Sequence, residues 1–108
     1  MTHKVSLSGP AKRDIAGIYQ YVAVNESNAV AQKLASGLKA AIFSLAELPE
    51  RGNIPKELDR LGLRDVREIH FKPYRILYET ADDEVFILGV FDGRRDMRSL
   101  LMNRLLRG

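Results

Sequence analysis

No cysteine occurs among the 108 residues of this chain, which excludes a disulfide framework, a thiolate nucleophile and a cysteine-ligated metal site. No apolar run is long enough to span a membrane, and the N-terminal "MTHKVSLSGP" lacks the basic region and long apolar stretch of a signal peptide. A glycine-rich phosphate loop, a metal-ligand spacing of His, Asp and Glu, and a supported Ser/His/Asp set are also missing. We therefore expect a cytoplasmic protein without a metal or a cofactor.

The composition that remains is ordinary for a folded globular protein. Hydrophobic residues make up 45% of the chain and charged residues 29%, which is far from the composition of disordered chains. A chain of this length has the usual size of one domain and is able to bury its own core. We expect a single domain over residues 1–108.

Positive charge is concentrated near the C-terminus. The formal net charge is +3, yet residues 94–107 hold five arginines against one aspartate, a net charge of +4, so the rest of the chain is slightly acidic. A guanidinium presents a planar fork of donors that suits carboxylates and phosphates. The segment therefore predicts a binding surface, although a turn after a buried strand also needs polar residues simply to face water.

Two helices are predicted in the first half of the chain. Pro10 suits the first helical position, with Ser8 or Gly9 as the cap, and apolar residues then recur at helical spacing as far as residue 22. Ser27 is a second cap, and a helix of about twenty residues runs from there towards Pro49. The short connection predicts an antiparallel helical hairpin.

The second half of the chain changes to a strand pattern. The stretch 49–62 reads as a loop with a helical turn at 56–61, and three β-prone segments follow, "VREIHF", "YRILYE" and "EVFILGVF". Residues 85–91 are nearly all apolar, which predicts a central strand covered on both faces. A short helix capped by Asp96 ends the chain, and "HKVSL" near its start is an edge strand. The expected fold is α+β, order βααβββα: an antiparallel sheet of an edge strand plus a three-stranded meander, packed against the N-terminal hairpin, with a short C-terminal helix.

Three stretches in this order resemble the ParE/RelE superfamily of type II toxins: the helix "GPAKRDIAGIYQYV", the strand "PYRILYE", and the strand "VFILGVF" that ends in "DGRRD". The resemblance covers nearly the whole chain, and the tail "RRDMRSLLMNRLLRG" is similar to the ParE-like branch. It implies the toxin of a toxin-antitoxin module for plasmid or chromosome stabilisation, one that inhibits DNA gyrase and blocks replication. It also implies a cognate ParD-like antitoxin that neutralises the toxin in a hetero-oligomer.

The RelE-like branch gives the alternative, a ribosome-dependent mRNA endonuclease. Cleavage by the 2′-hydroxyl needs a base, cationic groups at the phosphate and an acid for the leaving oxygen. RelE-like sites place a tyrosine or histidine near the C-terminus, but none follows the last strand here. A non-catalytic gyrase poison is therefore favoured. If the protein is a nuclease, its expected catalytic residues are Arg67, His70, Arg75, Arg94 and Arg95.

For a toxin that acts by binding, two kinds of contact residue are expected. The basic ones belong to the C-terminal segment, and the apolar ones are partly exposed leucines that an antitoxin would cover. Arg75 has two interpretations, a residue paired across the strands or a contact residue in an uncovered concavity of the sheet. The expected binding residues are Arg94, Arg95, Arg98 and Arg104, with Leu34, Leu38 and Leu101.

Overall fold

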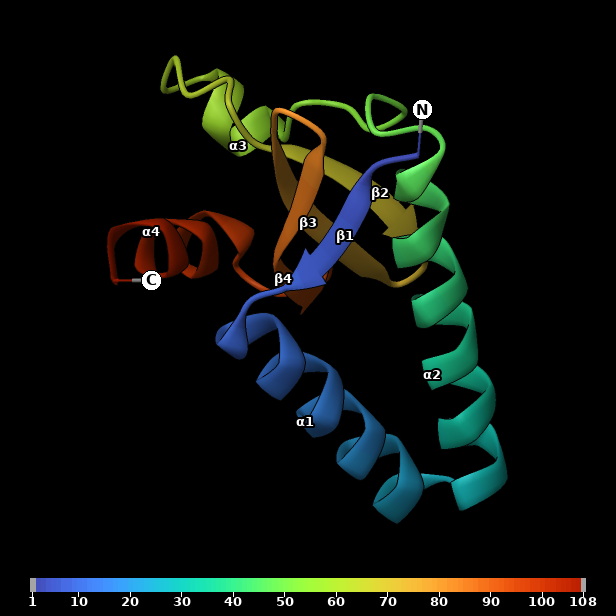
Figure 1. Cartoon of the computed structure of the whole chain (residues 1–108). Coiled ribbons are helices and arrows are strands. Elements are labelled where there is room, and N and C mark those ends of the chain that lie inside the picture. Colours follow the sequence, from blue (N-terminus) through green and yellow to red (C-terminus); the bar gives the residue numbers. More distant parts are fainter. Residues whose placement is uncertain (1, 108) are drawn as a thin grey trace.

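The computed structural model describes residues 2–107, and its helices and strands confirm the predicted order βααβββα (Figure 1). A four-residue helix, α3, stands in the predicted loop where a helical turn was expected. A short 3₁₀ helix, η1, follows α2. The elements are β1 (Lys4–Leu7), α1 (Gly9–Asn25), α2 (Asn28–Phe43), η1 (Ser44–Ala46), α3 (Lys56–Asp59), β2 (Arg67–Phe71), β3 (Tyr74–Ala81), β4 (Glu84–Asp92) and α4 (Met97–Arg107).

Both predicted serine caps are confirmed by their hydrogen bonds. The hydroxyl of Ser8 accepts from the backbone N–H of Ala11 at 3.1 Å, and that of Ser27 accepts from Val30 at 3.1 Å. Each bond satisfies one N–H group that the first turn of a helix leaves without an intrahelical partner. These caps set the starts of α1 and α2, and with them the position of the hairpin turn.

The second helix ends earlier than the apolar repeat predicted. The regular helix stops at Phe43 and tightens into η1 before the chain reaches Pro49. The hydroxyl of Ser44 donates to the carbonyl oxygen of Ala41 at 2.6 Å, an alternative backbone partner of the kind that ends or bends helices. The apolar repeat beyond Phe43 therefore belongs to η1 and the loop.

The four strands form one sheet in the order β1-β4-β3-β2. The meander β2-β3-β4 is antiparallel, and β4 is an interior strand, as predicted. The edge strand β1, however, pairs with β4 in parallel, from Lys4 opposite Glu84 to Leu7 opposite Ile87. The reason is that α1 leads away from the sheet and α2 returns to it, so β2 starts at the same end as β1 (Figure 1). Two further reversals then give β4 the direction of β1.

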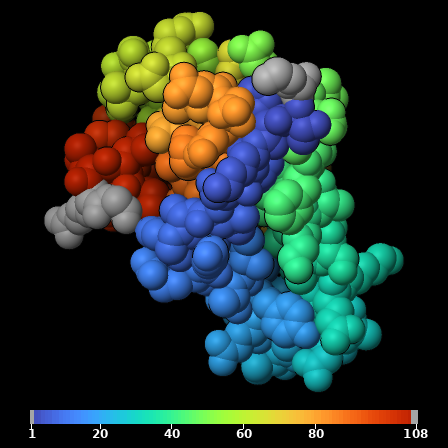
Figure 2. All heavy atoms as spheres, in the orientation of Figure 1, coloured from blue at the N-terminus to red at the C-terminus, as the bar shows by residue number. Residues whose placement is uncertain are grey.

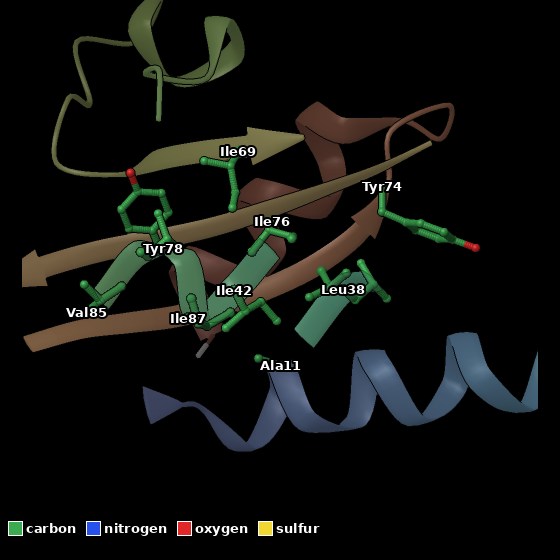
Figure 3. Close-up of a cluster of buried hydrophobic side chains, with 11 residues drawn as sticks. Ala11, Leu38, Ile42, Ile69, Tyr74, Ile76, Tyr78, Val85 and Ile87 are labelled. Carbon is green, nitrogen blue, oxygen red and sulfur yellow. The ribbon is translucent and has the colours of Figure 1, made fainter. Parts of the chain in front are cut away.

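In the part of the chain that the structure describes, helices pack on both faces of the sheet, and α3 and α4 cover the meander face that carries Arg75. The helices α1 and α2 pack on one face over the cluster that includes Leu38, Ile42, Ile76, Tyr78 and Ile87 (Figure 3). On the opposite face a second cluster joins α3 and α4 to the strands, and it consists of Leu58, Val66, Leu77, Phe91, Met97 and Leu101. Within residues 2–107, no helix is both long enough and apolar enough to cross a membrane.

Candidate functional site

Arg75 lies on the face covered by α3 and α4, where two carboxylates hold its guanidinium. Nη1 and Nη2 donate to the two oxygens of Glu57 at 3.0 and 2.8 Å, and Nε donates to Glu68 at 2.6 Å. The Arg75 side chain is only 11% exposed. Of the two interpretations of Arg75, the structure supports the paired residue. Arg75 is not a contact residue in an uncovered concavity, because α3 and α4 lie over this face of the sheet.

The electrostatics of this cluster follow from those hydrogen bonds. The bonds from Arg75 lower the pKa of Glu57 to about 2 despite its partial burial, and the bonds to Glu57 raise the pKa of Arg75. The two carboxylates and one guanidinium carry a net charge of −1. A phosphate group approaching Arg75 would find the donor fork occupied and the local charge repulsive.

The other residues expected for a nuclease do not complete a site around Arg75. His70 stands opposite Arg75 in the register, and its Nε2 lies 3.4 Å from a Glu68 oxygen. Arg67 donates instead to the carbonyl oxygen of Gly52 at 2.8 Å. The structure thus brings His70, Arg75 and Glu68 together, and the guanidinium of Arg67 is engaged by a loop.

Arg94, Arg95 and Arg98 lie on the surface after β4. Arg94 donates twice to Asp92, from Nε at 2.9 Å and from Nη2 at 2.7 Å, while its side chain stays 74% exposed. These hydrogen bonds lower the pKa of Asp92 to about 2. Arg95 and Arg98 are exposed. Of the predicted basic contacts, these three are available to a partner in the described structure.

Arg104 is used inside the fold. Its Nη1 and Nη2 donate to the two oxygens of Asp14 at 2.7 and 2.9 Å, which ties α4 to α1. Its guanidinium also lies 4.7 Å from the centre of the Phe91 ring, a cation–π distance. These contacts hold one wall of a furrow between α1, the end of β4 and α4. Arg13, Tyr21, Arg94, Arg95 and Arg104 are among the residues that line this furrow.

Of the three leucines predicted to contact an antitoxin, two are more buried than expected. Leu38 and Leu101 are 1% and 0% exposed, so the expectation that they keep free apolar surface is wrong. Each points into one of the two cores, since both faces of the sheet carry helices. Leu34 is partly buried against the first core.

Apolar surface is found instead in a groove beside the edge strand β1. Its walls come from α1 and α2, and two lysines, Lys12 and Lys39, stand among its lining residues. Phe43 at the end of α2 is 49% exposed. The apolar lining of this groove, named here the hairpin groove, consists of Leu7, Ile15, Ala16, Tyr19, Ala35, Ile42 and Phe43.

Sequence reasoning missed the acidic partners of the arginines. For Glu68 a signal exists, because it precedes His70 by two positions in β2. Once β2 and β3 are placed in register, Glu68 therefore lies on the same face of the sheet as the His70–Arg75 pair. For Glu57 and Asp14 no local signal exists, since the first comes from the loop helix α3 and the second from α1, far from Arg104 in the chain. Among residues 2–107 no group of three or more His, Cys, Asp or Glu side chains is arranged to hold a metal ion.

Comparisons with known proteins agree on one kind of protein. Residues 5–97 match the family described as "ParE toxin of type II toxin-antitoxin system, parDE". The chain is 26% identical over 99 residues to Toxin ParE3 of Caulobacter vibrioides, covering 91% of this chain and 94% of that protein.

Solved structures with the same fold are also toxin-antitoxin proteins. A chain of the chromosomal ParDE system from P. aeruginosa is similar with a TM-score of 0.72 and 18% identity, over 84% of this chain and 96% of that one. A chain of the RelBE2 complex of Mycobacterium tuberculosis has a TM-score of 0.61 and 20% identity, over 85% of this chain and 99% of that one. A mutant of E. coli toxin RelE in the free state has a TM-score of 0.65 and 15% identity, over 99% of this chain and 98% of that one. At these identities the structural likeness concerns the fold.

Proposed function

Because the chain belongs to the ParE toxin family of type II toxin-antitoxin systems, we propose that it binds DNA gyrase in the cytoplasm and blocks replication without cleaving RNA. Its role as the toxin of such a module follows from the family. The gyrase target comes from the resemblance to the ParE-like branch. A mechanism of binding without cleavage is supported by the ion pairs of Arg75 with Glu57 and Glu68.

The observation that carries a binding mechanism is the pair of carboxylates on Arg75. Arg75 was expected among the catalytic residues if the protein is a nuclease, yet its guanidinium is bonded to Glu57 and Glu68. His70 faces Glu68 as well, with its Nε2 3.4 Å from a carboxylate oxygen. A net negative cluster under two helices gives no stabilisation to the charge that builds on a phosphate during cleavage.

The arginine surface after β4 is the contact region proposed for the target. Arg94, Arg95 and Arg98 are exposed, and they begin the segment that carries the whole excess of positive charge. A surface of this kind attracts an acidic partner and speeds its association. We assign these three residues to target binding.

The hairpin groove is the seat proposed for the antitoxin. Related chains have been solved as parts of ParDE and RelBE2 systems, and a groove of apolar residues beside an edge strand suits an amphipathic helix or an added strand. Lys12 and Lys39 favour a segment with acidic residues beside its apolar anchors. Toxin and antitoxin would then form a hetero-oligomer.

Expression of the toxin without an antitoxin tests the target. We expect filamented cells, arrested replication and, with purified protein, loss of supercoiling by gyrase. Primer extension on ribosome-bound messages should detect no new cuts. Discrete cuts in the ribosomal A site, with normal gyrase activity, would instead establish the endonuclease.

Charge reversal tests the arginine surface. Arg94→Glu with Arg95→Glu should leave the melting temperature almost unchanged, because both side chains are exposed, and should weaken gyrase inhibition at least about tenfold. Lys33→Glu with Arg60→Glu makes the same change in net charge at exposed positions outside the furrow. Equal losses in both variants would mean that only net charge matters.

A separate substitution tests the hairpin groove. Phe43→Asp should weaken binding of the protein encoded beside the toxin gene by at least about tenfold, while gyrase inhibition persists. Leu48→Asp is the control, since Leu48 is 62% exposed but lies outside the groove. Unchanged binding by the Phe43 variant would exclude the groove as the antitoxin seat.

A further inference from the structure

Gly17 occupies the middle of α1 without any reason inside the fold. Glycine is a poor helix former, second only to proline, because its backbone loses the most freedom on ordering. A Cβ built at Gly17 meets no atom within 4 Å, so packing does not require its absence. At Gly37 in α2, by contrast, a Cβ would collide with the ring of Phe71, and packing explains the glycine. We therefore infer that glycine at position 17 serves the approach of a binding partner.

The position of Gly17 indicates where such a partner would approach. Gly17 lies in the wall of the furrow between α1 and the segment after β4, close to Arg13, Tyr21, Arg94 and Arg95. A second hollow continues along α1 as far as Pro10 and shares Arg13 with the first. From Pro10 to Tyr21 the helix rises about 16 Å. In Figure 1, α4 and the end of β4 lie beside the N-terminal half of α1, and in Figure 2 the atoms of α4 and α1 stand next to each other.

The charge of the furrow selects the class of partner. Its lining holds four arginines against two aspartates, a net charge of +2. Duplex DNA presents about one negative charge per 1.7 Å, or about ten over this length, and the carboxylates of Asp14 and Asp92 would repel it. An extended polypeptide covers the same length with about five residues. Two acidic side chains among them match the furrow.

We propose that the furrow seats an acidic, extended polypeptide segment whose main chain approaches α1 at Gly17. The segment belongs to the toxin's protein target, so the assignment rests on the proposed function and adds the contact surface to it. Arg13 and Arg95 bind its carboxylates at the two walls. Tyr21, which is 69% exposed, packs along its side. Arg104 positions α4 through Asp14 and keeps the furrow open.

Nuclear magnetic resonance with the full-length, ¹⁵N-labelled protein tests the furrow directly. The probes are a short peptide of alternating glutamate and alanine, its lysine–alanine counterpart, and a DNA duplex of similar length. We expect the glutamate peptide alone to shift the amide signals of Arg13, Gly17 and Arg95, with affinity that falls as salt rises. Stronger binding of the DNA at these residues, or shifts confined to other residues, would overturn the proposal.

Filling the furrow is the complementary test. Gly17→Leu improves the helix, and its Cβ meets no atom within 4 Å, so the melting temperature of the variant should equal or exceed that of the wild type. It should reduce both glutamate-peptide affinity and gyrase inhibition at least about tenfold, while antitoxin binding stays unchanged. Full peptide binding by this variant would refute the furrow assignment. If the wild type itself leaves gyrase active, the proposed target fails, and the peptide titration still decides the furrow.

Discussion

Replacing Glu57 by glutamine should change the stability of this protein in a defined pH window. Glu57 comes from the short helix α3 and accepts two hydrogen bonds from Arg75, with its side chain 15% exposed. Glutamine has nearly the same shape, so the substitution removes the charge and leaves the packing. It therefore isolates the electrostatic part of the contact.

The magnitude follows from the pKa of Glu57, which the hydrogen bonds from Arg75 lower from 4.5 to about 2. Each pKa unit corresponds to about 1.4 kcal/mol, so the shift corresponds to about 3 kcal/mol of folding stability. Because the folded-state pKa is the lower one, this stability is fully present above about pH 4.5 and is lost as the pH falls towards 2. At pH 7 we expect Glu57→Gln to unfold more easily by about 2–3 kcal/mol, since the amide oxygen keeps one acceptor.

Urea unfolding followed by circular dichroism between pH 2 and pH 7 measures this difference. The gap between wild type and Glu57→Gln should be widest at neutral pH and close near pH 2. Asp59→Asn is the control on the same helix, because the Asp59–Arg64 pair is exposed on both sides, and it should change stability by less than about 0.5 kcal/mol. A gap of the same size at pH 2.5 and pH 7 would refute the electrostatic explanation and assign the loss to packing.

Other substitutions probe the parts of the fold that hold the site. Tyr78→Phe removes the hydroxyl that accepts the backbone N–H of Gly52 at 3.0 Å, and thermal unfolding should report a loss of about 1–2 kcal/mol; no loss would mean that water replaces the bond. Gly37→Ala places a methyl group against the ring of Phe71 and should cost about 1–3 kcal/mol in urea unfolding, whereas an unchanged midpoint would show that α2 can move away from the sheet. Ser27→Ala removes the cap of α2 and should cost about 1 kcal/mol by the same measurement, with Ser27→Thr restoring most of it.

Much of the fold was predictable because the signals are local. The caps at Ser8 and Ser27, the helical spacing of α1 and α2, and the apolar run of β4 each depend on residues a few positions apart. The direction of β1 was not predictable in this way, because it depends on how the whole hairpin returns the chain to the sheet. The covering of the second face was missed for the same kind of reason, since α3 and α4 meet there from distant parts of the sequence.

The candidate site divides along the same line. The exposed arginines Arg94 and Arg95 could be identified from charge and from the turn that follows a buried strand, because both properties belong to neighbouring residues. The roles of Arg75 and Arg104 could not, since each depends on a carboxylate distant in sequence. Leu101 shows what the sequence could not predict for an apolar residue. The pattern of an amphipathic helix indicates which face is buried, but not whether the same domain or a partner covers that face.

The sequence by itself determined the succession of elements, the starts of the helices, the interior strand and the basic character of the C-terminal segment, all through short-range chemistry. Only the tertiary structure decided which of the arginines remain available to a partner. Folding brings Glu57 and Glu68 to Arg75 and Asp14 to Arg104, while it leaves Arg95 in solvent. The physical reason is that an ion pair depends on distance in space, and the chain places these carboxylates beside their arginines only once both faces of the sheet are covered.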